Sequence, residues 1–329
     1  MNKRLLLTQD SAGKTLAEVQ NFDKPDSQNG DLEIKVSHSA INYKDALAVT
    51  GKAPIIRSFP LVPGIDACGE VISSDNPKFK VGDKLLATGW GLGEKHNGGH
   101  TTQMRLKSTY GLHLPSGMEA STAMILGTAG FTAMLCVKAI TDKGIQPDAG
   151  PILVSGASGG VGGIAVKILS AKGYEVVAVS SEQGAPLAKS LGASKCIMRD
   201  EMAAENKPLE EQKWAAAVDT VGGKILGRIL AETKYGGLVA ACGLASGAGL
   251  STTVMPFILR GITLAGIDSV YYPAGGREEV WQELSSSFKV DAAGLGDWMT
   301  EISLEQVPEY CDKLLKGEVK GKVLINLQK

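Results

Sequence analysis

The sequence of 329 residues has few aromatic residues, no excess of charge of either sign and no long unbroken hydrophobic run. Phe, Trp and Tyr together make up 5%, and 34 Lys and Arg stand against 35 Asp and Glu, which gives a net charge of −1. Without a basic excess, nucleic acid is not an expected partner. Two uncharged stretches, residues 120–137 and 235–259, are interrupted by hydroxyl residues or by glycines and a proline. We therefore expect buried strands, turns and short helices there, and no membrane partner.

Cysteine is also scarce and scattered. The five cysteines are separated from one another by more than forty residues, which favours neither a disulfide framework nor a metal-binding motif. The N-terminal segment MNKRLLLTQDSAGK begins with basic residues but holds only three consecutive leucines, too few for the apolar core of a signal peptide. We expect reduced, mostly buried thiols and a cytoplasmic location.

Glycine, by contrast, is abundant, with 41 residues. The chain length predicts two domains. Residues 1–123 read as short strands separated by turn signals, which indicates a compact, mostly antiparallel, barrel-like unit. Residues 268–329 contain two amphipathic helical patterns, Glu278–Phe288 and Leu304–Lys316, and end in the strand-like KVLINL. A lone final strand usually completes a sheet begun elsewhere, so we assign this part to the first domain, which becomes discontinuous.

The middle part, residues 124–267, alternates strand and helix patterns. Expected strands are Ile152–Ser155, Glu175–Ser180, Lys195–Met198, Ala215–Asp219, Leu238–Ala241 and Leu264–Ile267. Such alternation predicts an α/β domain in which a parallel sheet is covered on both faces. A sheet of this kind binds ligands at the carboxyl ends of its strands.

A glycine-rich segment, Gly156–Gly162 (GASGGVG), follows the first of these strands and precedes a helix. Glycines allow the backbone to approach a pyrophosphate closely, and the helix N-terminus presents free N–H groups to it. The strand–loop–helix context is what a dinucleotide-binding motif requires.

The identity of the dinucleotide depends on the end of the next strand. NAD enzymes usually place an acidic residue there to hold the ribose 2′-hydroxyl, whereas here the strand ends in Ser180-Ser181, followed by Glu182. Hydroxyl groups tolerate a 2′-phosphate, and Arg199 beyond the third strand could supply positive charge. We predict NADP as the cofactor.

Several segments resemble the medium-chain dehydrogenase/reductase superfamily, and in particular its zinc-free quinone oxidoreductase-like group with the acrylyl-CoA reductases. The segments are NYKD at 42–45, FPLVPGID at 59–66, TGWG at 88–91, ILGTAGFTAMLCV at 125–137, the glycine loop, AVDTVG at 217–222 and TVMPFILR at 253–260. The resemblance covers nearly the whole chain. It implies a GroES-like, mostly β catalytic domain (1–123 and 268–329), a Rossmann doubly wound domain (124–267), NADPH and a homodimer.

The resemblance also implies a set of cofactor contacts. They are Tyr43, Ser158, Gly159, Gly160, Val161, Ser180, Ser181, Glu182, Arg199, Leu244, Ile258 and Ser269. Relatives often carry an arginine just after the second-strand serine, and this chain does not. Arg199, together with Lys189 or Lys195, is then left to meet the 2′-phosphate.

The ligands of a catalytic zinc are missing. Alcohol-oxidising members of the superfamily bind zinc through Cys, His and Cys or Asp, whereas the corresponding segments here read NYKD at 42–45 and PGID at 63–66. His96 and His100 flank the loop sequence NGG, so we interpret them as loop residues and not as ligands. Without a Lewis acid, hydride abstraction from an alcohol is difficult.

A zinc-free reductase suits a conjugated acceptor. Hydride transfer to the β-carbon of an enoyl thioester places negative charge on the carbonyl oxygen, which needs a hydrogen-bond donor, and the α-carbon needs a proton. Tyr43 and Asp45 replace a zinc-ligand segment, so we expect both to face the nicotinamide, and Arg57 to meet an anionic group of the substrate.

The predicted function is therefore NADPH-dependent reduction of acryloyl-CoA or a similar short enoyl thioester without zinc. Two alternatives remain: an NADPH-dependent quinone reductase, and a non-catalytic NADPH-binding protein that resembles the crystallin-type members of the superfamily. The expected partners are a small-molecule substrate and a second copy of the chain.

Overall fold

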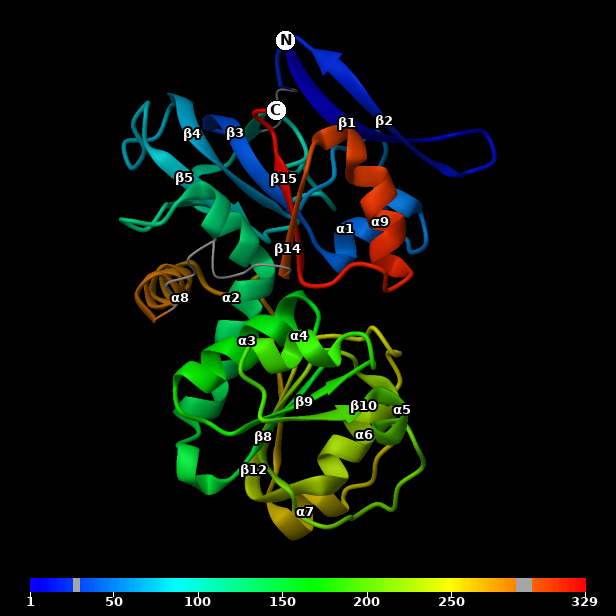
Figure 1. Ribbon diagram of the computed structural model, residues 1–329. Helices are drawn as coiled ribbons and strands as arrows, with labels where there is room; N and C mark the ends of the chain where they lie inside the picture. The colour runs from blue at the N-terminus through cyan, green and yellow to red at the C-terminus, as the bar shows by residue number, and fades with distance from the viewer. Residues whose placement is uncertain (26–29, 288–297) are drawn as a thin grey trace. The chain divides into compact units, whose positions relative to one another are not determined.

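A computed structural model describes residues 1–25, 30–287 and 298–329, and the chain divides into two compact units (Figure 1). Unit 1 comprises Met1–Thr128 and Val270–Lys329, and unit 2 comprises Ala129–Ser269. The sequence placed these boundaries at 123/124 and 267/268. The first boundary differs because helix α2 (Ala120–Asp142) runs through it.

Unit 1 is built on a mostly antiparallel sheet with the strand order β14-β15-β3-β4-β5-β7, with β6 paired to β3, and on a separate β1–β2 hairpin. The strands are β1 (Asn2–Gln9), β2 (Thr15–Phe22), β3 (Leu32–Ile41), β4 (Asp66–Ser74), β5 (Lys84–Thr88), β6 (Gln103–Leu106), β7 (Gly111–His113), β14 (Met299–Ile302) and β15 (Lys322–Asn326). The last strand, β15, pairs antiparallel with β3 and parallel with β14, so it joins the sheet where we expected it.

The helices of unit 1 cover this sheet. Helix α1 (Tyr43–Thr50) packs against α9 (Val307–Leu315), as the blue and red ribbons show (Figure 1). A core of buried leucine, isoleucine and valine side chains lies between them and the sheet. Helix α8 (Ala274–Ser287) contains most of the helix expected over Glu278–Phe288, and Phe288 itself lies outside the described residues. Short 3₁₀ turns cover Ser108–Tyr110 and Leu304–Gln306.

Unit 2 contains the predicted parallel sheet, which confirms the fold class. Its strand order is β10-β9-β8-β11-β12-β13, and every neighbouring pair is parallel. The strands are β8 (Ile152–Ser155), β9 (Val176–Ser180), β10 (Lys195–Met198), β11 (Trp214–Asp219), β12 (Thr233–Ala241) and β13 (Thr263–Gly266). Strands β9 and β10 are added on one side of β8, and β11 to β13 are added on its other side. The strand order therefore reverses between β8 and β11, and a ligand crevice is expected at the carboxyl ends of these two strands.

Helices cover both faces of this sheet (Figure 1). They are α3 (Gly160–Ala171), α4 (Ala185–Ser190), α5 (Arg199–Met202), α6 (Gly223–Glu232) and α7 (Met255–Arg260), with a 3₁₀ turn over Pro147–Ala149. Helices α3 and α4 lie over one face, and α5 and α6 pack against each other and β10–β12. Burial of both faces explains why β8, β9 and β11 are buried throughout.

Helix α2 is the long apolar element over residues 120–142, where the sequence suggested shorter pieces. By length and composition it could cross a membrane, but 83% of its most apolar 18-residue window is buried inside the protein. Gly127 interrupts it with a non-helical backbone, φ 48°. A side chain at Gly127 would collide with the Asp66 carboxylate, so glycine is required where that carboxylate approaches the helix.

Candidate functional site

The carboxyl edge of the unit 2 sheet collects most of the predicted cofactor contacts. Gly156–Gly162 follows β8, Ser181 and Glu182 follow β9, and Arg199 follows β10 directly. The register aligns Ser155 with Val179 and Met198 with Ser180. Parallel strands in register end at the same edge, so these three segments are neighbours although up to forty-odd residues separate them in sequence.

The glycine loop has the features that a pyrophosphate requires. Gly156 adopts the left-handed backbone, φ 60°, and a Cβ there would collide with the Thr220 hydroxyl. A Cβ on Gly162 would collide with the Gly156 carbonyl oxygen. Helix α3 begins after Gly159 without a side-chain cap, so its first N–H groups have no carbonyl partner within the helix. The loop therefore fits a phosphate-bearing dinucleotide.

The second-strand serines differ in their surroundings. Ser180 is buried, and its hydroxyl donates a hydrogen bond to the Ser158 hydroxyl at 2.9 Å, which ties the glycine loop to the end of β9. Ser181 and Glu182 are exposed. Arg199 is exposed and makes a 3.5 Å ion pair with Asp200. The exposed members of this group are available to a ligand.

A buried hydrogen-bond network beneath the loop was missed by the sequence analysis. The Ser155 hydroxyl donates to the Asp219 carboxylate at 2.7 Å, and Gly222 N–H donates to the same carboxylate at 2.8 Å. Thr220 N–H donates to the Ser155 hydroxyl oxygen at 2.9 Å. Burial raises the pKa of Asp219. The network joins the carboxyl ends of β8 and β11, between which the strand order reverses. In the sequence, this network was signalled only by an acidic residue at the end of a predicted strand.

Of the remaining residues in unit 2 that were predicted to contact the cofactor, only some lie at the carboxyl edge of the sheet. Leu244 lies just after β12 and Ser269 just after β13, on the carboxyl edge. Ile258 is different, since it lies in α7, which leads into the start of β13. Arg260, two residues later, donates to the Thr233 carbonyl at 3.2 Å, at the amino end of β12. The structure therefore separates Ile258 from the other predicted contacts, because α7 runs back along the sheet.

The predicted catalytic residues all belong to unit 1. Tyr43 is the first residue of α1, and 46% of it is exposed. Its neighbour Lys44 pairs with Glu94, and Arg57 N–H donates to the Glu94 carbonyl at 3.4 Å. Tyr43 and Arg57 are thus each linked through the main chain to one residue of this ion pair, and both are exposed to solvent.

Asp45 corrects the expectation that it faces the nicotinamide beside Tyr43. It is only 1% exposed, and its carboxylate accepts hydrogen bonds from Asn42 N–H at 2.9 Å and Ile65 N–H at 3.0 Å. The Asn42 contact caps the N-terminus of α1. Residues two apart on a helix point about 200° apart, so an exposed Tyr43 implies an inward-facing Asp45.

A cluster of buried polar residues surrounds Asp45 and was also missed. Asn42 Nδ2 donates to the Asp66 carboxylate at 2.7 Å, and the Lys322 ammonium donates to Asn42 Oδ1 at 2.8 Å. Asp66 further accepts from the Thr128 N–H at 3.0 Å and the Thr128 hydroxyl at 2.5 Å. We call Asn42, Asp45, Asp66 and Lys322 the buried charge cluster. It fixes the start of α1, from which Tyr43 projects.

The buried charge cluster contains two carboxyl groups but only one ammonium group. Burial raises the pKa of Asp45 and Asp66 and lowers that of Lys322, while attraction between the ammonium and the carboxylates opposes both effects. Nearby, burial lowers the pKa of His100 to about 4, so its imidazole is neutral at pH 7. His100 lies in the loop between β5 and β6, as the sequence indicated, and its side chain is fully buried.

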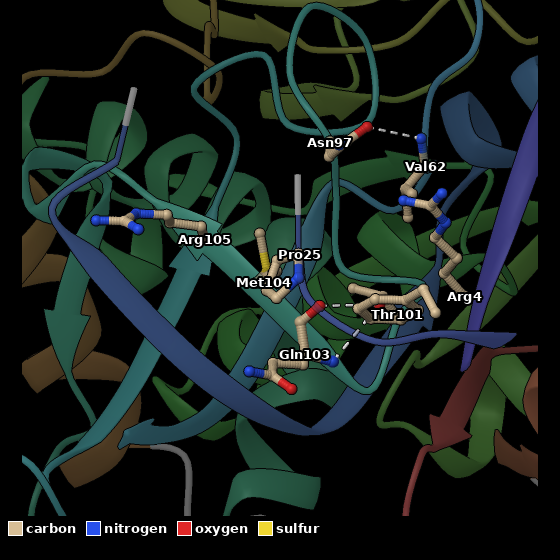
Figure 2. A pocket seen from close by; sticks show the side chains of 9 residues that line it. Arg4, Pro25, Val62, Asn97, Thr101, Gln103, Met104 and Arg105 are labelled. Atoms are coloured by element: carbon tan, nitrogen blue, oxygen red, sulfur yellow. Dashed lines mark hydrogen bonds between the residues drawn. The ribbon is translucent and has the colours of Figure 1, made fainter. Parts of the chain in front are cut away.

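A metal-binding group or a pocket in unit 1 would be a further candidate for a site in the described part of the chain. Across the described residues, no three His, Cys, Asp or Glu side chains gather as a metal-binding group. Figure 2 shows a pocket lined by Arg4 of β1 among others, where Asn97 accepts a hydrogen bond from Val62 N–H at 2.9 Å. Its volume is about 20 Å³, which is room for a water molecule and not for a substrate.

Comparisons with known proteins cover both units. The family described as "Alcohol dehydrogenase GroES-like domain" matches residues 28–139, and "Zinc-binding dehydrogenase" matches residues 160–288. The Escherichia coli K12 protein named "Probable acrylyl-CoA reductase AcuI" is 49% identical, over 98% of this chain and 99% of that protein.

Two solved structures are similar throughout. The yhdH oxidoreductase from Salmonella enterica in complex with NADP is 48% identical, with a TM-score of 0.95 over 99% of each chain. The Bacillus subtilis protein yhfP with NAD bound is 40% identical, with a TM-score of 0.93 over 99% of this chain and 100% of that one.

Proposed function

The chain belongs to the medium-chain dehydrogenase/reductase superfamily, and from this premise we propose that it reduces the carbon–carbon double bond of acryloyl-CoA, or a similar short enoyl thioester, with NADPH. The observation that carries the proposal is the 49% identity, over nearly the full length, to a protein named as an acrylyl-CoA reductase. The glycine loop and the serines at the end of β9 support the choice of cofactor.

The residues that would hold NADPH lie on the carboxyl edge of unit 2. N–H groups at the start of α3 would receive the pyrophosphate, and Ser181 and Arg199 would meet the 2′-phosphate. When bound, the nicotinamide supplies the hydride. The part of this chain is then to stabilise the negative charge on the carbonyl oxygen of the thioester and to protonate its α-carbon, and the exposed Tyr43 hydroxyl is the group we assign to this oxygen.

We further propose that the reaction needs no zinc. The segments that correspond to zinc ligands hold Asp45 and Asp66, whose oxygens already accept hydrogen bonds from Asn42, Ile65 and Thr128. The cation beside them is the Lys322 ammonium. A donor set occupied in this way has no place for a divalent cation.

A homodimer and a cytoplasmic location are part of the same proposal. Val254, Ile258 and Leu259 are large exposed apolar residues on and beside α7, next to the edge strand β13. Exposed apolar surface beside an open sheet edge favours association with a second copy. Light scattering by the purified protein tests the dimer, and fractionation of cells tests the location.

The function is tested by following NADPH oxidation with acryloyl-CoA, crotonyl-CoA and a naphthoquinone side by side. We expect the highest kcat/KM with acryloyl-CoA, and no loss of rate after treatment with EDTA. Faster turnover of the naphthoquinone would instead favour a quinone reductase. Stoichiometric binding of NADPH without turnover of any acceptor would favour a non-catalytic binding protein, and EDTA-sensitive activity restored by zinc would overturn the metal-free mechanism.

We predict that kcat/KM with NADPH exceeds that with NADH by at least about tenfold, because a charge-assisted hydrogen bond to the 2′-phosphate contributes roughly 1.5–3 kcal/mol. The preference should fall in Arg199→Ala and persist in Lys143→Ala, which removes an exposed lysine before β8. Because the similar protein yhfP has NAD bound in its structure, the two cofactors have to be compared directly in this protein. Equal kcat/KM values for the two cofactors would contradict the prediction.

A further inference from the structure

A group of basic side chains lies beside Tyr43 on unit 1. Lys44 is next to Tyr43 in the chain and pairs with Glu94, which is mostly buried. The Arg57 N–H donates to the Glu94 carbonyl at 3.4 Å, and Lys95 follows Glu94 in the chain. One carboxylate therefore stands among three cations, and this patch has an excess of positive charge.

In the part of the chain that the structure describes, neither Arg57 nor Lys95 forms an ion pair with a carboxylate, unlike Lys44. Both are exposed, and within the described residues the Arg57 side chain has no hydrogen bond or ion pair. The hydrogen bond with Tyr271 raises the pKa of Lys95, Glu94 adds to this effect, and the nearby charge of Arg57 opposes it, so the two cations lie close enough to repel each other. Because the Glu94 carboxylate is paired with Lys44, the two neighbouring cations favour an anion that carries more than one negative charge.

Lys95 is held in place although it is exposed. Its ammonium donates to the Tyr271 hydroxyl at 2.7 Å and lies 5.2 Å from the centroid of that ring. A side chain that is already ordered loses less conformational entropy when it binds a ligand.

The loop that carries Glu94 and Lys95 is also fixed. Trp90, at its start, has a left-handed backbone with φ 56°, and its ring stacks on Tyr110 with 5.6 Å between the ring centroids. The guanidinium of the buried Arg277 lies 4.5 Å above the Trp90 ring and donates to the Thr88 and Val270 carbonyls. Strained backbone that is held by its surroundings is frequent at binding sites.

We propose that Arg57 and Lys95 bind the phosphate groups of the coenzyme A part of the thioester substrate. The inference rests on the proposed function, and it names the part of the site that would distinguish a CoA thioester from other enoyl compounds. Planar guanidinium groups bind phosphate oxygens in pairs, and a lysine adds a point charge. Tyr43 would remain at the acyl end.

The test compares acryloyl-CoA with acryloyl-pantetheine, which carries the same thioester without phosphate groups. In the full chain we expect a higher kcat/KM for acryloyl-CoA, and a loss of this preference by about tenfold or more in the double variant Arg57→Ala/Lys95→Ala. Lys78→Ala/Lys80→Ala, which removes two exposed lysines from the turn between β4 and β5, is the matched control and should keep it. Tyr271→Phe should weaken the preference in part, because it removes the hydroxyl that holds Lys95.

A binding measurement separates this inference from the proposed function. Calorimetry with adenosine 3′,5′-bisphosphate, in the presence of saturating NADP⁺ to fill the cofactor site, should show binding that the double variant loses. Such a loss in a protein that turns over neither thioester would support the phosphate site and refute the reductase. Turnover of both thioesters with an unaltered preference in the double variant would refute the phosphate site alone. A rise in the KM for NADPH in place of the loss of preference would assign Arg57 and Lys95 to the cofactor and overturn the inference.

Discussion

Replacing Lys322 with Met is expected to lower the free energy of unfolding by about 3–5 kcal/mol, because it leaves buried carboxylates without their cation. Lys322 is 3% exposed, and its ammonium holds Asn42 at 2.8 Å beside Asp45 and Asp66. Methionine has a similar length and no charge, so packing changes little. The measurement is chemical denaturation at pH 7, with Lys320→Met as the control, since Lys320 is exposed two residues earlier and its replacement should change stability by less than about 0.5 kcal/mol.

The destabilisation should depend on pH with a definite sign. Burial already raises the pKa of Asp45 and Asp66 above the usual 3.8, and loss of the ammonium raises both further. The native variant then binds more protons than the unfolded chain between pH 3.8 and its raised pKa, so its free energy of unfolding falls as the pH rises through that range. We expect a smaller deficit at pH 5 than at pH 8. The same deficit at both pH values would show that the charge of Lys322 is not what stabilises the cluster.

Tyr43→Phe is expected to reduce kcat at least tenfold with NADPH and acryloyl-CoA. Removing a donor to a developing oxyanion costs roughly 10²–10³ in kcat, and removing a general acid about 10²–10⁴. We set the lower bound because Tyr43 is 46% exposed, so water can replace part of the lost hydrogen bond. The KM for NADPH should change less than kcat, since the glycine loop holds the phosphates.

Steady-state kinetics separates this role from a purely binding role. If Tyr43 only orients the cofactor, the KM for NADPH rises and kcat stays near that of the unmodified protein. Tyr235→Phe is the control, because Tyr235 is an exposed tyrosine near the amino end of β12, whereas the glycine loop lies at the carboxyl edge of the sheet. An unchanged kcat in Tyr43→Phe would remove Tyr43 from the catalytic residues.

The parallel sheet and the glycine loop were predictable because their signals are local. Ile152–Ser155 is a short apolar run that leads directly into Gly156–Gly162, and a helical pattern follows within the same thirty residues or so. The same is true of β9 and β10, which differ by at most one residue from the segments expected. The conformation of the strand and of the loop is determined here mainly by residues that are close in the sequence.

The buried charge cluster could not be predicted in the same way. Asn42, Asp66 and Lys322 come from three distant segments. The segments of Asn42 and Asp66 stand out only as replacements for zinc ligands, and Lys322 looks like an ordinary surface residue in its own sequence context. Only the pairing of β15 with β3 brings Lys322 to Asn42. Asp45 is an intermediate case, since the spacing Asn42-x-x-Asp45 at a helix start indicates a cap and could have shown that its side chain faces inward.

The position of β15 has a consequence for the synthesis of the protein. Although it is the last strand in the sequence, β15 lies between β14 and β3 in the sheet and carries Lys322 into the cluster that anchors α1. A nascent chain still attached to the ribosome near residue 320 has made every predicted site residue but lacks the cation that holds Asn42. Tyr43 is therefore set in place only once β15 has been made, whereas unit 2, whose strands all precede residue 270, can complete its sheet while the later segments are still being synthesised.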